Sequence, residues 1–220
     1  TPGLFEYGGA AGPDGGTGRN SVGATNFDGG GWNVTIKGTS SGNGTTYVHL
    51  GAQNGGTGAV NQTGVWYHIA LERKSSKTRF YVDGTALAMN EGDGSGTLYT
   101  DIPDTTDYDA TNLSISGYYD TNYLLDGQIS NFRVVKGTAV YGGNFQRPRA
   151  ELTNITNTEL LCCQSTNSTT AATVIPTGSI TASGDPTATS VSLNSWSTPS
   201  ITWPDSITWD GGSAPTLLGA

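Results

Sequence analysis

The sequence predicts an all-β protein made of two antiparallel sheets packed face to face, with a short β-rich appendage at the C-terminal end. The 220-residue chain has 33 glycines and only 13% charged residues. This composition favours turns over helices, and no segment shows a long 3.6-residue apolar period. Short runs that alternate apolar with polar residues recur instead, as in half-buried strands.

Changes in composition along the chain divide it into three regions. Residues 1–31 contain one predicted strand, at 4–7, and glycine-rich loops. Residues 32–165 form the predicted sandwich. Residues 166–220, rich in Ser, Thr, Ala and Pro, form a predicted linker and a tryptophan-containing appendage. The strands of the sandwich are expected near 32–38, 46–51, 65–74, 78–83, 97–102, 112–117 and 124–136.

The clearest hairpin lies between residues 65 and 84. Two alternating runs flank the basic turn at 74–77, and the second run ends at Asp83-Gly84, a pair that suits a tight turn at positive φ. Ile129 and Phe132 are three residues apart, so a regular strand would place them on opposite faces. This spacing predicts either a bulge in the last strand or a strand with apolar surroundings on both faces. The core candidates are Trp66, Ile69, Leu71, Phe80, Val82, Ile115, Ile129, Phe132 and Val134.

Two segments resemble a known family. The run W-Y-H-I-A-L-E-R at 66–73, followed by F-Y-V-D-G at 80–84, is similar to the central hairpin of the laminin-G-like, concanavalin A-like jelly-roll domain. The run L-D-G-Q-I-S-N-F-R-V-V-K-G-T-A-V-Y at 125–141 resembles its closing strand and trailing loop. The resemblance spans about residues 45–165 and implies a jelly-roll sandwich. Lectins, adhesion modules and glycosidases share this fold, so the fold does not decide function.

The K-G-T-A-V-Y segment at 136–141 is similar to the version found in structural proteins of tailed bacteriophages with marine or cyanobacterial hosts. This resemblance implies a non-catalytic virion protein: a tail fibre, an appendage or a capsid-decorating subunit. Its expected partners are copies of itself, other virion proteins and a host surface glycan. The alternative is an extracellular protein, namely a secreted or cell-surface carbohydrate-binding or adhesion module of a cellular organism.

The acidic residues do not predict an enzyme. A retaining glycosidase needs two carboxylates about 5–5.5 Å apart, and jelly-roll glucanases commonly carry them close together on one strand. Asp107 and Asp109 are a pair, but their surroundings indicate a loop. The two histidines, His49 and His68, are weak candidates for a nucleophilic triad. None of the four glutamates has the glucanase spacing: Glu6, Glu72, Glu91 and Glu159.

Sugar recognition needs aromatic platforms beside polar groups. Residues 118–123 supply both within one loop, and Trp32 follows a glycine run that suggests a loop edge. Tyrosines between strands also serve as packing residues, so this alternative stays open. The candidate glycan ligands are Trp32, Tyr118, Tyr119, Asp120, Asn122 and Tyr123.

No cofactor or metal site is assigned, although Ca²⁺ is left open because loop carboxylates suit a hard cation. Asp126-Gly127 is more typical of a turn. The net charge of −8 argues against nucleic-acid binding, and no apolar run approaches the ~20 residues needed for membrane insertion. The carboxylates considered for Ca²⁺ are Asp104, Asp107, Asp109, Asp120 and Asp126.

Cys162 and Cys163 are the chain's only cysteines and are adjacent. The Cα atoms of neighbouring residues are ~3.8 Å apart, too close for an ordinary disulfide. We therefore expect two buried or half-buried thiols, with an intermolecular bridge as the alternative.

The C-terminal appendage contains a repeat, S-I-T-W-P-D followed by S-I-T-W-D, at 200–210, and then G-G-S-A-P-T at 211–216. This stretch resembles segments near the C-termini of phage fibre and other virion proteins. It is too short to fold alone, so it is expected to dock on the sandwich or on another subunit. Early strands of the family are expected to be missing, which would leave an edge for a neighbouring copy. The predicted subunit-interface residues are Phe5, Tyr7, Trp196, Trp203 and Trp209.

Overall fold

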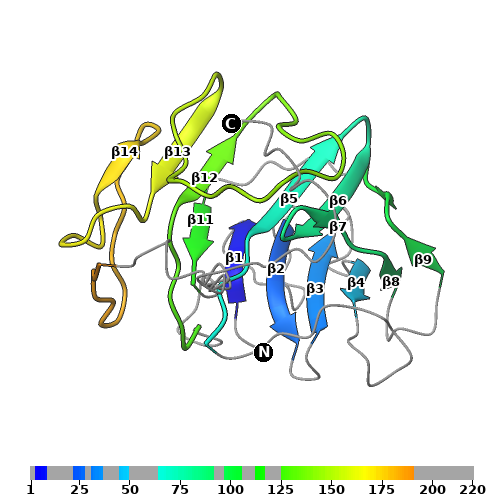
Figure 1. Cartoon of the computed structure of the whole chain (residues 1–220), viewed down its shortest axis with the longest axis horizontal. Coiled ribbons are helices and arrows are strands. Elements are labelled where there is room, and N and C mark those ends of the chain that lie inside the picture. The colour runs from blue at the N-terminus through cyan, green and yellow to red at the C-terminus, as the bar shows by residue number, and fades with distance from the viewer. Residues whose placement is uncertain are drawn as a thin grey trace, which may run out of the picture.

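The computed structural model describes residues 3–8, 22–27, 31–36, 45–49, 64–91, 97–105, 112–116 and 125–190. Across these ranges every regular element is a strand, which confirms the all-β prediction (Figure 1). The strands are β1 Gly3–Gly8, β2 Val22–Phe27, β3 Gly31–Ile36, β4 Thr45–His49, β5 Ile69–Lys74, β6 Lys77–Val82, β7 Thr85–Ala86, β8 Met89–Glu91, β9 Leu98–Tyr99, β10 Ile102–Pro103, β11 Asn112–Ile115, β12 Phe132–Val135, β13 Thr158–Cys162 and β14 Ala172–Val174.

The described strands form three antiparallel sheets. The largest has seven strands in the order β11-β1-β2-β3-β4-β8-β9. The second has the order β10-β6-β5, with β7 paired to β6. A third sheet, β12-β13-β14, includes the yellow and orange strands at the left of Figure 1. The first two sheets are the layers of the predicted sandwich. The third contains β12, which lies in a strand predicted for the sandwich, together with β13 and β14, which were not predicted from the sequence.

The central hairpin forms as predicted. Lys74 pairs with Lys77 across a two-residue turn in which Ser75 and Ser76 have φ of 50° and 57°. Asp83 and Gly84 repeat this conformation, with φ of 49° and 84°, between β6 and β7. Two consecutive residues at positive φ match the twist of the flanking strands, which explains why such short turns connect them.

The main core lies between the two large sheets. Trp32 and Val34 on β3 meet Phe80 and Val82 on β6 in one buried cluster. Because these pairs come from different sheets, their contact shows that the sheets pack face to face. Leu87, Met89 and Ile102 complete the buried cluster, and Tyr67, Ile69, Leu71 and Tyr99 pack against it.

The predicted core is confirmed in its centre and wrong at its edges. Phe80 and Val82 are buried, and Ile69 and Leu71 pack beside them. The other candidates are only half-buried, because Trp66 precedes β5 and β12 belongs to the third sheet. The candidates outside the main cluster are Trp66, Ile115, Ile129, Phe132 and Val134.

Three predicted strands have different bounds. The strand expected from residue 65 begins at Ile69. The strand expected at 97–102 is split by a bend into β9 and β10, which join different sheets. The strand expected at 124–136 shrinks to β12, because Asn131 has φ of 56° and breaks the extended backbone. Ile129 therefore lies outside the strand, and its parity with Phe132 requires no bulge between them.

The N-terminal region joins the large sheet. β1 pairs with β11 on one side and β2 on the other, so it is an interior strand of its own chain. A neighbouring copy therefore has no open edge of β1 to complete. The predicted interface residues Phe5 and Tyr7 lie on β1, but their side chains are outside the described part, as are Trp196, Trp203 and Trp209.

Candidate functional site

Most of the predicted glycan ligands lie outside the described residues: Tyr118, Tyr119, Asp120, Asn122 and Tyr123. Trp32 is described, and its position corrects the prediction. Only 4% of its surface is exposed, and its ring packs against Tyr67 and Phe80 at centroid distances of 5.7 and 6.0 Å. Because β3 starts at Gly31, Trp32 lies within a strand of the large sheet and not in a loop, and its indole packs in the core. It therefore cannot serve as an exposed platform for a sugar.

Aromatic and polar side chains gather over the outer face of the central hairpin. Ala70 pairs with Tyr81, and Glu72 with Arg79, on the side of β5 and β6 opposite the core residues. Residues 141–147 contact this face through the hydrogen bonds and ring contacts given below. We call residues 137–147, which comprise these residues and the four that lead into them, the clamp segment.

Glu72 anchors the clamp segment. Its carboxylate accepts hydrogen bonds from the backbone N–H of Tyr141 at 2.6 Å and of Gly142 at 2.8 Å. The Tyr81 hydroxyl donates to the same carboxylate at 3.4 Å, and Glu72 is only 7% exposed. Arg79 adds a bond from its guanidinium to the carbonyl of Gly142 at 2.9 Å. These bonds tie the backbone of residues 141 and 142 to side chains on the outer face of the hairpin.

The other end of the clamp segment is fixed at the turn after β6. The N–H of Phe145 donates to the carbonyl of Gly84 at 2.9 Å, and the N–H of Ala86 donates to Asn144 Oδ1 at 2.9 Å. A Cβ at position 84 would lie 1.9 Å from the carbonyl oxygen of Phe145. Glycine is therefore required both by the positive φ and by this close approach.

An aromatic cluster sits where the clamp segment crosses the hairpin. Tyr141 and Phe145 are half-buried and stack with centroids 3.5 Å apart and planes 7° apart. His68 meets both rings edge-on, at 6.2 and 5.5 Å, and buried Tyr81 lies within 6.2 Å of each. Burial raises the pKa of the Tyr141 hydroxyl, although Arg133 opposes this shift.

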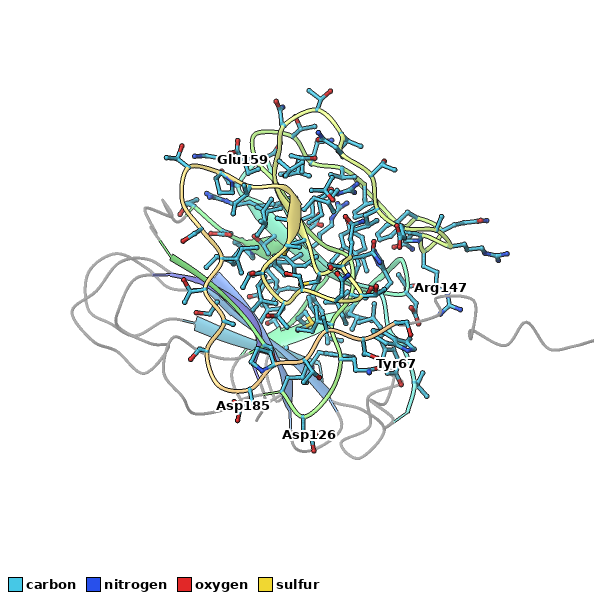
Figure 2. All side chains as sticks on the ribbon, turned by 90° about the vertical axis from the view of Figure 1, so that its left-hand side faces the viewer. Tyr67, Asp126, Arg147, Glu159 and Asp185 are labelled. Carbon is cyan, nitrogen blue, oxygen red and sulfur yellow. The ribbon has the colours of Figure 1, made fainter. Side chains whose placement is uncertain are left out.

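Charged groups lie beside this cluster. Arg147 Nη1 is 3.4 Å from Asp83 Oδ1, the atom that also accepts the backbone N–H of His68 at 3.0 Å. Figure 2 shows Arg147 on the side of the molecule where Tyr67 also lies, away from Glu159. Half-exposed rings beside charged hydrogen-bonding groups are what a sugar-binding surface needs.

The sequence supplied these residues but not their role. His68, Tyr81 and Tyr141 lie inside the two motifs that carry the family resemblance, and none of them was predicted from the sequence to bind a sugar. Phe145 and Arg147 follow the second motif. The separation of about 60 residues between Tyr81 and Tyr141 gives no local sign that they meet.

The described carboxylates near the hairpin are engaged in structural contacts. Asp104 is buried, accepts the Thr78 hydroxyl at 2.5 Å and lies 3.5 Å from Arg73 Nε. Asp101 binds Arg79, and this hydrogen bond lowers the pKa of Asp101. A general acid of a glycosidase needs the opposite shift.

The remaining candidates for catalysis are spread over the chain. Glu159 lies exposed on β13, away from Arg147 at the end of the clamp segment (Figure 2). Asp107 and Asp109 lie outside the described residues, and so do the side chains of Glu6, Glu91 and His49.

Two of the carboxylates considered for Ca²⁺ are described. The neighbours of Asp104 are a hydroxyl donor and a guanidinium, which do not suit a metal ligand, so Asp104 drops out as a calcium candidate. Asp126 is exposed, in a bend with Gly127. Within the described ranges no three His, Cys, Asp or Glu side chains gather closely enough to hold a metal. In these ranges, moreover, no helix is long and apolar enough to cross a membrane.

We expect the stability of the fold to fall as the pH drops below 6.5, because His68 is held neutral. Burial lowers the pKa of His68; Asp83 raises it, while Arg133 and Arg147 add to the lowering. Its buried Nδ1 has no hydrogen-bond partner among the described residues. Between the lowered folded-state pKa and 6.5 the unfolded chain binds more protons, so the free energy of unfolding rises with pH across that window.

Urea unfolding at several pH values between 5 and 8 measures this effect, and His68→Gln should flatten the profile in that window. Equal pH dependence in the wild-type and His68→Gln proteins would contradict the assignment.

Comparison with known proteins gives one match. A family model described as the concanavalin A-like lectin/glucanases superfamily, of the laminin G type, matches residues 12–139, more than half of the 220 residues. The matched region includes β2 through β12, and therefore the facing strands of the sandwich. No curated protein and no solved structure matches the chain.

Proposed function

The chain belongs to the concanavalin A-like lectin/glucanases superfamily, and on this premise we propose that it is a non-catalytic carbohydrate-binding or adhesion module. The observation that carries the non-catalytic part of the proposal is that the described carboxylates around the hairpin make structural contacts. Glu72, Asp101 and Asp104 hold together the clamp segment and the sheet, through partners that fix their geometry. A glycosidase of this fold would need a carboxylate pair free to exchange protons with a sugar.

Two surfaces are candidates for sugar contact. The first is the tyrosine-rich loop at 118–123, which combines aromatic and polar side chains within six residues. The second is the described edge of the aromatic cluster, where Tyr141 and Phe145 are half-buried beside Arg147. The family includes both lectins and glucanases, so the type of sugar is a matter for experiment.

We further propose that the module is a structural subunit of a tailed-bacteriophage particle, as a fibre, appendage or capsid-decorating protein. The support is the resemblance of residues 136–141 and of the Trp203–Trp209 appendage to parts of such proteins. The clamp role of residues 137–147 reduces the weight of the first resemblance, because any sandwich of this family could use the same clamp. Self-association through Trp203 and Trp209 stays a prediction.

The second candidate is a secreted or cell-surface adhesion module of a cellular organism. It rests on the superfamily match alone, which covers the sandwich and gives no origin. Mass spectrometry of purified phage particles separates the two candidates, because a virion subunit co-purifies with the particle in a fixed ratio to its capsid protein.

A glycan array followed by calorimetry on its hits tests the binding function. We expect binding in the wild-type protein and at least a tenfold loss in the triple variant Tyr118, Tyr119 and Tyr123→Ala if the loop is the site, since stacking contacts of this kind contribute about 0.5–1.5 kcal/mol each. Phe145→Leu, which keeps an apolar side chain but removes the ring, tests the aromatic cluster in the same assay.

Hydrolase assays on the bound glycans should show no turnover. Turnover that disappears on replacing Asp107 or Asp109 with Asn would overturn the non-catalytic assignment. Absence of any glycan binding, with the protein folded, would overturn the carbohydrate-binding one.

A further inference from the structure

The thiol groups of the adjacent cysteines at the end of β13 lie closer together than neighbouring side chains of a regular strand would. Successive side chains of a regular strand point to opposite faces, which would separate the two thiols. Cys162 is the last residue of the strand, but Cys163 has φ of 60° and leaves the extended conformation. This change of direction goes with an Sγ–Sγ distance of only 3.6 Å.

The backbone around Cys163 is held in this conformation by a polar network. The carbonyl of Cys163 accepts the N–H of Asn131 at 3.0 Å and the Ser130 hydroxyl at 3.5 Å. The Gln164 side chain donates to Asn131 Oδ1 at 3.0 Å and to the carbonyl of Leu152 at 2.8 Å. A pair of thiols fixed in advance loses little conformational entropy when it binds one ligand.

We propose that Cys162 and Cys163 form a dithiol site that chelates one thiophilic metal or metalloid centre. Two thiolates on one tetrahedral centre, with metal–sulfur distances of about 2.3 Å, are roughly 3.8 Å apart. The observed separation is 3.6 Å. An ordinary disulfide instead needs Cα atoms at least about 4.4 Å apart, whereas neighbours are held at ~3.8 Å. The pair is therefore better suited to chelation than to oxidation.

The chemistry of the site follows from the two environments. A hydrogen bond from Cys162 lowers the pKa of Cys163, while the same contact and burial raise the pKa of Cys162. Cys163 is half-buried and Cys162 is 2% exposed, so the ligand reaches Cys163 first. With an organic arsenoxide, two As–S bonds form, the As=O bond breaks, and the two thiol protons leave with its oxygen as one water molecule. No oxidant or reductant is needed.

Phenylarsine oxide is a suitable probe, because the chain has only these two cysteines. Intact-mass spectrometry of the full chain should show one arsenical per molecule that withstands excess glutathione, a monothiol, but is removed by a dithiol such as 2,3-dimercaptopropanol. In Cys163→Ser the bound fraction at a given glutathione concentration should fall about 100-fold, since the second contact is lost. Asn131→Ala, which loosens the network, should weaken retention about tenfold.

The comparison of glutathione with the dithiol uses the wild-type protein alone. It therefore tests chelation by both cysteines even if Cys163→Ser folds poorly. Removal of the arsenical by glutathione as readily as by the dithiol would overturn the proposal. An air-formed disulfide between the two cysteines that blocks the probe would also overturn it. Neither result bears on the proposed glycan-binding function, because the glycan array tests that function through substitutions at other residues.

Discussion

Gly84→Ala is expected to give the largest loss of stability among single glycine substitutions in the described chain. The new Cβ would lie 1.9 Å from the carbonyl oxygen of Phe145 and 2.9 Å from its carbonyl carbon, both backbone atoms. The clamp segment would have to move, and the bond from the Phe145 N–H to the Gly84 carbonyl would break. This clash and the strain of a positive φ at alanine together should lower the free energy of unfolding by roughly 3–5 kcal/mol.

Gly137→Ala is the matched control. Gly137 also lies in the clamp segment and has almost the same φ, 82° against 84°, but a Cβ there would meet nothing within 4 Å among the described residues. It should cost only about 1–2 kcal/mol, the strain of the left-handed conformation. Chemical denaturation of both variants measures the difference. Equal losses would show that the approach of Phe145 does not constrain position 84.

Glu72→Ala is expected to release the clamp segment. The substitution leaves the backbone N–H groups of Tyr141 and Gly142 without their acceptor, and removes one hydrogen-bond acceptor of the Tyr81 hydroxyl. Hydrogen bonds to a charged group contribute about 1.5–3 kcal/mol each, but these backbone donors are only half-buried, so we expect a loss of about 2–4 kcal/mol. Glu72→Gln should cost less, because the amide keeps one acceptor oxygen.

Hydrogen exchange separates this mechanism from general unfolding. The amide protons of Tyr141 and Gly142 should exchange faster in Glu72→Ala, while those of Phe80 and Val82 in the core keep their relative protection. Glu159→Ala is the control, since Glu159 is exposed on β13 and lies away from Arg147, the last residue of the clamp segment (Figure 2). Its effect should be within about 0.5 kcal/mol. Unchanged exchange at Tyr141 in Glu72→Ala would refute the anchoring role.

These two predictions share one physical idea. The outer face of the central hairpin carries Glu72, Arg79 and Tyr81, which a two-sheet sandwich would leave toward solvent. The clamp segment covers this face, and in doing so assembles the aromatic cluster of His68, Tyr141 and Phe145. The stability of the small sheet and the integrity of this candidate sugar-binding surface are therefore expected to change together.

The alternation of apolar and polar residues determined the all-β class and the hairpin without help from tertiary contacts. Turns form as expected at Lys74-Ser75-Ser76-Lys77 and at Asp83-Gly84, where one alternating run ends and the chain reverses through residues at positive φ. Phe80 and Val82 are buried for a related reason, since the period of two places them on one face of one strand.

The tertiary structure decided which sheet each strand joins and where the clamp segment goes. Trp32 was predicted to lie at a loop edge because it follows three glycines, but the packing of β3 on β6 buries it. Residues 124–136 read as one long strand, but positive φ at Asn131 ends the extended run.

Contacts between distant segments leave no local trace in the sequence. Glu72 and Tyr141, 69 residues apart, meet through one carboxylate. Cys162 and Cys163 are neighbours, yet their thiols come together only because the network around Asn131 holds Cys163 out of the strand. Local patterns therefore determined the class and the hairpin, while long-range hydrogen bonds determined the candidate sites.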